Sequence, residues 1–67
     1  MAYRDAKNNL FPDPGELVRH KGMGIVGRYV QDVACNGSRR HMKVIAVIDG
    51  VEKVLILPAG DFEEVKG

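Results

Sequence analysis

Two apolar runs separated by a short turn signal dominate the second half of the chain. The first run ends at Asp49 and the second begins after Gly50, and most of their apolar members are valine or isoleucine: Val44, Ile45, Val47, Ile48, Val51, Val54, Leu55 and Ile56. An Asp-Gly pair between such runs is typical of a type I′ hairpin, because both central residues of that turn need a positive φ. β-branched residues favour the extended backbone. The pattern therefore predicts a β-hairpin over residues 42–57.

Both runs are apolar at consecutive positions rather than at alternate positions. A strand with this pattern needs cover on both of its sides, whereas an alternating strand keeps one side in solvent. We therefore expect something to cover each face of the hairpin. A chain of 67 residues lies near the lower limit for an independent hydrophobic core, so the same pattern favours a homo-oligomer.

Three shorter segments complete the predicted set of strands: residues 15–21, 25–34 and 62–65. Cys35-Asn36-Gly37-Ser38 predicts a second hairpin turn. Pro58-Ala59-Gly60-Asp61 interrupts the pattern before the last strand and predicts a single 3₁₀ turn. Five short strands with glycine-rich turns predict an all-β fold, a small five-stranded antiparallel barrel. A 3₁₀ turn before the closing strand is typical of SH3-like barrels, and this is the fold class that we predict.

Within the predicted barrel, single residues carry further expectations. Val18 is expected to point inward and Arg19 outward, and Phe62 and Val65 are the expected buried anchors of the last strand. Gly27 lies inside the second strand and predicts a bulge or a strongly coiled corner there.

Residues 1–14 are predicted to form a flexible N-terminal arm, and residues 15–67 the barrel domain. The arm is polar and contains two prolines, and its first eight residues carry the clearest signal of flexibility. Leu10 and Phe11 differ from the rest of the arm because they are large and apolar. We expect these two residues to lie across the barrel as a cover.

Composition excludes several classes of protein. The net charge is +1, which is too small for a general polyanion binder. The single cysteine excludes an internal disulfide framework and fits a reducing compartment. No apolar run approaches the ~20 residues of a membrane span, and we expect a cytoplasmic protein with no membrane contact.

The densest basic cluster lies before the predicted hairpin, and we predict that it binds a partner. Its expected members are Arg39, Arg40, His41 and Lys43, with Arg28 and Tyr29 beside them on the preceding strand. On a strand, Arg40 would point to the face opposite the other three. One interpretation is a surface for phosphate or for an acidic protein, with Tyr29 as a stacking platform. The alternative is a solvated flank that protects the strand edge from aggregation.

The sequence predicts no catalytic residue, no cofactor and no metal site. His20, Cys35 and His41 lack the spacing of metal ligands, and we expect His20 to be half-buried and bonded to a backbone carbonyl. No serine or cysteine lies in a pattern that would activate it as a nucleophile. We therefore expect the protein not to be an enzyme.

The barrel positions carry a resemblance to a known family. The segments GELVRHKGMGIVGRYV and KVLILPAGDFEEV resemble the RNA-polymerase-interacting domain of CarD-type transcription regulators and transcription-repair coupling factors. The matching positions are Gly15-Glu16, Val18, Gly24-Ile25, Pro58 and Asp61. The resemblance implies a barrel that docks on a protein partner through a strand edge or an exposed sheet face, with RNA polymerase as the partner.

A second likeness is to the plasmid-type (type II) dihydrofolate reductases, which are also short SH3-like chains with an N-terminal arm. The shared features are the opening Gly15-Glu16-Leu17-Val18-Arg19 and the segment that ends at Pro58. Those enzymes are tetramers that use a glutamine and a tyrosine in the second motif, where this chain has Leu55 and Leu57. Neither leucine can hydrogen-bond a pteridine or a nicotinamide.

The function predicted from the sequence is therefore a non-catalytic protein-interaction module that docks on the transcription machinery. Two alternatives stay open. One is a KOW- or Tudor-like module that binds nucleic acid through the basic cluster, and the other is an oligomeric protein of the type II reductase kind.

Overall fold

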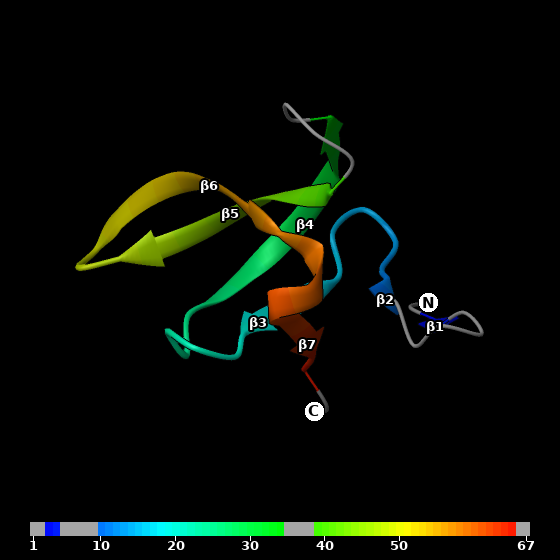
Figure 1. Ribbon diagram of the computed structural model, residues 1–67. Helices are drawn as coiled ribbons and strands as arrows, with labels where there is room; N and C mark the ends of the chain where they lie inside the picture. The colour runs from blue at the N-terminus through cyan, green and yellow to red at the C-terminus, as the bar shows by residue number, and fades with distance from the viewer. Residues whose placement is uncertain (1–2, 5–9, 35–38, 66–67) are drawn as a thin grey trace.

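The computed structural model describes residues 3–4, 10–34 and 39–65, and this part of the chain is all-β (Figure 1). Its elements are β1 (Tyr3–Arg4), β2 (Leu10–Phe11), β3 (Leu17–His20), β4 (Val26–Ala34), β5 (Arg40–Ile48), β6 (Val51–Pro58), the 3₁₀ helix η1 (Ala59–Asp61) and β7 (Phe62–Glu64). The described residues contain no α-helix, and hence none of the length and apolar character that crossing a lipid bilayer requires.

Five of the strands form one antiparallel sheet in the order β6-β5-β4-β3-β7, and β1 and β2 pair separately. The all-β prediction is thereby confirmed. The predicted closure into a barrel is not seen, because β6 and β7 are the two edges of the sheet and no pairing joins them in the described part of the chain. η1 turns the chain back from β6 so that β7 pairs with β3, and β7 has only three residues with which to pair.

The predicted hairpin is formed by β5 and β6, which pair without interruption from His41 opposite Pro58 to Ile48 opposite Val51. Asp49 and Gly50 connect them with φ values of 53° and 75°. Both central residues thus have the positive φ that a type I′ turn needs. The predicted 3₁₀ turn after Pro58 is also confirmed as η1.

Of the two predictions for Gly27, a bulge or a strongly coiled corner, the bulge is wrong. Gly27 pairs regularly with Val18 and with Ala46, and the register shifts further along β4, between Tyr29 and Gln31. The glycine is needed because β4 approaches β5 closely there. A Cβ atom at position 27 would overlap the Val44 side chain and lie 2.8 Å from the carbonyl oxygen of Ile45.

The core lies on one face of the sheet, where η1 and β2 cover it. Its members are Leu10, Val18, Tyr29, Met42, Val44, Ala59 and Phe62. Val18 is fully buried and Arg19 is exposed, as predicted. Phe62 is buried, but Val65 is only half-buried. Leu10 is 3% exposed, so the predicted cover over the core is confirmed for this residue.

Two predictions lie outside the described residues. The second hairpin turn falls on residues 35–38, and the flexible part of the arm falls mostly on residues 1–2 and 5–8.

Candidate protein-binding surface

The predicted basic cluster is divided between the two faces of the sheet. Met42, Val44 and Ala46 of β5 are buried in or beside the core, so Arg40 lies on their side of the strand. His41 and Lys43 alternate with them and lie on the opposite side, which we call the outer face. The alternation predicted for this segment is thus present. Arg39 is exposed and directly precedes β5.

Arg40 is an internal contact of the fold rather than part of an open surface. Its Nε donates a hydrogen bond to Oδ2 of Asp32 at 2.7 Å, and its Nη1 donates one to the carbonyl oxygen of Leu10 at 2.6 Å. Its guanidinium carbon lies 4.1 Å from the centroid of the Phe11 ring, which is the geometry of a cation–π contact. Arg40 therefore holds Leu10 and Phe11 against the end of β5 through a hydrogen bond and a cation–π contact.

Tyr29 is also an internal residue. It is 8% exposed, and its hydroxyl donates a hydrogen bond to Oδ1 of Asp32 at 2.7 Å. A ring buried in this way has no free face on which a base could stack. Tyr29 therefore does not provide the stacking platform that we expected.

The carboxylate of Asp32 receives bonds from both of these residues, and its pKa reflects this. Partial burial opposes ionisation, but the hydrogen bonds from Arg40 and Tyr29 outweigh burial and hold the pKa of Asp32 below its ordinary value. Burial raises the pKa of Tyr29, and the bond to Asp32 raises it further. Asp32 thus stays charged and Tyr29 neutral around neutral pH, which keeps this network intact.

Arg28 lies on the outer face, opposite Ile45 in the pairing of β4 with β5. It is exposed, and its Nη1 donates a hydrogen bond to the carbonyl oxygen of Gly15 at 3.2 Å. Lys43 lies opposite Gln31 and His41 opposite Val33 on the same face. The structure therefore leaves Arg28, His41 and Lys43 on the outer face, with Arg39 exposed beside them.

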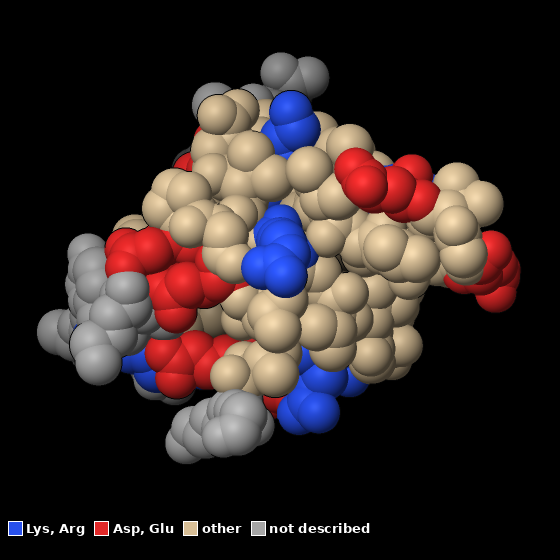
Figure 2. All heavy atoms as spheres, turned by 180° about the vertical axis from the view of Figure 1, so that it is seen from behind, with Lys and Arg blue, Asp and Glu red and all other residues tan. Residues whose placement is uncertain are grey.

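Most of the outer face is apolar rather than basic. Its exposed apolar side chains are Leu17 (43% exposed), Val26 (42%), Val47 (68%), Val54 (56%) and Ile56 (46%). Leu17, Val26, Ile45 and Val47 line a shallow groove there together with Arg28 and Glu52. Figure 2 shows that uncharged residues cover much of the molecule as seen from behind, with separate Lys and Arg patches at the top, centre and bottom and carboxylates toward either side.

The sequence predicted cover on both faces of the hairpin, and the described part of the chain covers only one. The signal that could have identified the outer face as a candidate surface was the same run of consecutive apolar residues.

The free edge of β6 is a second open feature. Among the described residues β6 pairs with β5 alone, and four consecutive residues in its second half, Val54-Leu55-Ile56-Leu57, carry no charge. Adjacent pairs of an antiparallel ladder alternate between bonded and non-bonded, and the pair that closes a two-residue hairpin is bonded. The pair that closes this hairpin is Ile48 and Val51, so Val54 and Ile56 belong to non-bonded pairs. Their N–H groups therefore point away from β5. Most exposed edges are protected by charge or proline, and β6 has these only toward its ends, at Glu52, Lys53 and Pro58.

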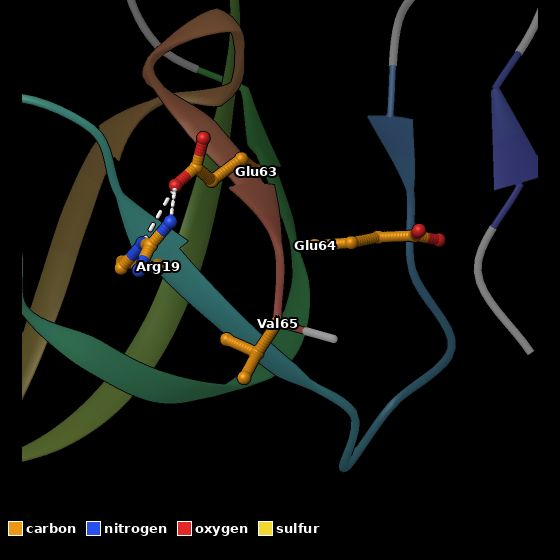
Figure 3. Close-up of a pocket in the computed structure, with 4 residues that line it drawn as sticks. All are labelled: Arg19, Glu63, Glu64 and Val65. Atoms are coloured by element: carbon orange, nitrogen blue, oxygen red, sulfur yellow. Dashed lines mark hydrogen bonds and ion pairs between the residues drawn. The ribbon is translucent and has the colours of Figure 1, made fainter. Parts of the chain in front are cut away.

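A small pocket lies where β3 meets β7, and two of its charged residues, Arg19 and Glu63, pair with each other. Figure 3 shows Arg19 and Glu63 pointing toward one another, while Glu64 points the other way. Nε of Arg19 donates to Oε2 of Glu63 at 2.6 Å, and Nη2 contacts the same oxygen. The described residues include no cluster of three or more His, Cys, Asp or Glu that could hold a metal ion.

His20 is buried, at 9% exposed, rather than half-buried as predicted, and its hydrogen bond also differs from the one predicted. Its Nδ1 accepts from the backbone N–H of Met23 at 3.0 Å, because the bend after β3 turns that N–H back toward the ring. We expected a bond to a carbonyl instead. The ring also packs against that of Phe62 in a T-shaped contact, with centroids 5.3 Å apart.

Comparison with protein-family models, with curated proteins and with solved structures finds no match to this chain. The resemblance to the CarD-type domain therefore rests on the residues of the sequence alone.

Proposed function

We propose that this chain is a non-catalytic protein-interaction module that binds an extended segment of a partner protein along the free edge of β6. The observation that supports this proposal is the uncharged edge formed by residues 54–57, which is open on the side away from β5. A partner strand would pair with the N–H and C=O groups of Val54 and Ile56 and extend the sheet. The other outer strand of the sheet, β7, has only three residues.

The chemistry of the edge defines the partner segment. Val54 and Ile56 lie on the outer face, while Leu55 and Leu57 alternate with them on the other side and are partly buried. A paired strand carries its side chains on the same two faces as its neighbour. The segment that fits is therefore extended and about four to six residues long, with aliphatic residues at successive positions.

From the resemblance to CarD-type domains we propose RNA polymerase as the partner, and with it a cytoplasmic location. We propose in addition that the fold is of the SH3-like kind. The return of β7 to pair with β3, directly after a 3₁₀ turn, supports this assignment.

The test is a binding assay with purified bacterial RNA polymerase and three forms of the immobilised chain. Val54→Pro removes an N–H group that points away from β5 and leaves the β5–β6 bonds in place. Val54→Thr keeps the N–H group and the β-branched shape, so it is the matched control. We expect the parent chain and Val54→Thr to retain the polymerase and Val54→Pro to lose it.

Circular dichroism of Val54→Pro shows whether it keeps the parent fold. Equal retention of polymerase by a folded Val54→Pro would contradict binding at the edge. No retention by any form would contradict polymerase as the partner.

Nucleic acid binding is the alternative outcome. The residues that would bind nucleic acid are Arg39, His41 and Lys43. Tyr29 is buried and Arg40 is hydrogen-bonded within the fold, so neither is available. Salt-sensitive binding of a labelled duplex that is lost in Arg39→Ala and Lys43→Ala would support that alternative. It would also contradict a function confined to the β6 edge.

A further inference from the structure

The outer face exposes more apolar surface than any other region of the described chain. Seven large hydrophobic side chains are well exposed, and five of them, Leu17, Val26, Val47, Val54 and Ile56, lie on this face. Contiguous apolar patches of this kind mark contact sites on small soluble proteins. The face is continuous across β3, β4, β5 and β6, because residues paired across these strands share one side of the sheet.

Two opposite charges flank the apolar centre of this face. Arg28 on β4 lies opposite Ile45, and Glu52 on β6 lies opposite Val47. β5 runs between β4 and β6, so the cation and the anion lie on either side of it. Neither residue forms an ion pair within the part of the chain that the structure describes. Both line the same shallow groove.

This arrangement is complementary to itself. A two-fold contact brings the same patch of both copies together, so each patch must contain both halves of every complementary pair. An axis along β5, between two stacked sheets, places β4 of one copy over β6 of the other. In this arrangement Arg28 of one copy and Glu52 of the other are offset along the strand direction by two residues, about 7 Å. Two long side chains can span that offset.

We propose that the outer face packs against the outer face of a second copy of this chain as a two-fold β-sandwich, in which Arg28 of each copy pairs with the other copy's Glu52. Aligned sheets pack about 10 Å apart, with the inner side chains interdigitated. The centre of the contact is Ile45 and Val47. The same axis brings the two Lys43 side chains toward each other at the end of β5 remote from Glu52, so the contact is weakest there.

The size of the molecule is consistent with such a contact. A standard interface takes about 800 Å² from each partner, about one-sixth of the chain's 4700 Å² of accessible surface. A face-to-face sandwich leaves the edge of β6 open. This inference therefore goes beyond the proposed function, and either can fail without the other.

The experiment is sedimentation equilibrium of the full chain over a concentration series. We expect a monomer–dimer equilibrium in the parent chain that is weakened about tenfold by Arg28→Glu and equally by Glu52→Arg. The double variant with both changes restores the parent affinity, because the pair is re-formed with its charges exchanged. Val47→Asp abolishes the dimer, and since this side chain is 68% exposed, the change spares the fold of the monomer.

Lys53→Glu is the control for charge reversal, because Lys53 is exposed on β6 but alternates with the outer-face residues. It should leave the dimer unchanged. A parent chain that is monomeric at every concentration would overturn the proposal. So would a dimer that persists in both Arg28→Glu and Val47→Asp.

Discussion

Arg40 binds the backbone of Leu10 across 30 residues of sequence, with Nη1 2.6 Å from the carbonyl oxygen. The same guanidinium lies over the Phe11 ring and is bonded to Asp32. A single side chain of β5, that of Arg40, therefore contacts both residues of β2, Leu10 and Phe11. Leu10 in turn covers the core. Burial of Leu10 thus depends on a polar contact as well as on its own apolar surface.

We predict that Arg40→Ala lowers the free energy of unfolding by about 2 kcal/mol, since Asp32 and the Leu10 carbonyl both lose a charged hydrogen-bond donor. Arg40→Lys should recover only part of this loss, because an ammonium group lacks the planar fork that reaches two acceptors. Urea denaturation measures both changes. Arg39→Ala is the matched control and should cost less than about 0.5 kcal/mol, since Arg39 is exposed. Equal stability of Arg40→Ala and Arg39→Ala would show that Arg40 does not anchor the segment.

Gly27 supports a second prediction, which concerns packing between β4 and β5. Gly27→Ala would place a methyl group against the Val44 side chain and the carbonyl oxygen of Ile45. Backbone atoms cannot move aside as a flexible side chain can, so we expect a loss of about 1–3 kcal/mol from overpacking.

Thermal unfolding provides the measurement for Gly27→Ala, with Gly60→Ala as the control. A methyl group at position 60 meets nothing within 4 Å, so Gly60→Ala should leave the melting temperature nearly unchanged. A Gly27→Ala variant as stable as the parent would mean that the two strands can separate at this point without cost.

The hairpin could be predicted from the sequence because its signals are local. Asp49-Gly50 specifies the turn and the valines and isoleucines beside it specify extended backbone, so neither depends on the rest of the fold. The 3₁₀ turn after Pro58 was predictable for the same reason. Whether the two edge strands, β6 and β7, pair and close the sheet depends on the direction in which η1 turns the chain. No local sequence pattern encodes that direction.

The candidate surface was predictable only in part. Alternation along β5 correctly separated Arg40 from His41 and Lys43. The role of Arg40 was missed because it depends on Asp32, which comes beside Arg40 only after β4 pairs with β5. Tyr29 and Asp32 are three residues apart on β4, and they share one face only because the register shifts between Tyr29 and Gln31. Likewise, Gly27 is required because a side chain there would overlap atoms of Val44 and Ile45, which are remote in sequence. Contacts between distant residues are what a single sequence does not display.

The Asp32 network supports a prediction about acid stability. The pKa of Asp32 is lower in the folded chain than its ordinary value of 3.8, because the hydrogen bonds from Arg40 and Tyr29 outweigh the opposing effect of burial. A carboxyl group with a depressed folded pKa adds stability that is present above its unfolded pKa and is lost as the pH falls through its folded pKa. We therefore expect the parent chain to lose stability below about pH 4, where Asp32 begins to bind a proton on unfolding.

Asp32→Asn tests this contribution, because the amide has nearly the same shape but does not titrate. Its free energy of unfolding should be lower than the parent's at neutral pH, and the gap between the two should narrow as the pH falls. Tyr29→Phe is a second test variant. It removes the hydrogen bond from Tyr29 to Asp32 but keeps the one from Arg40 to Asp32, so it should retain most of the acid dependence. Urea midpoints measured at neutral and acidic pH report both effects. A gap between parent and Asp32→Asn that stays constant with pH would mean that the Asp32 carboxylate is no more stabilised in the folded chain than in the unfolded one.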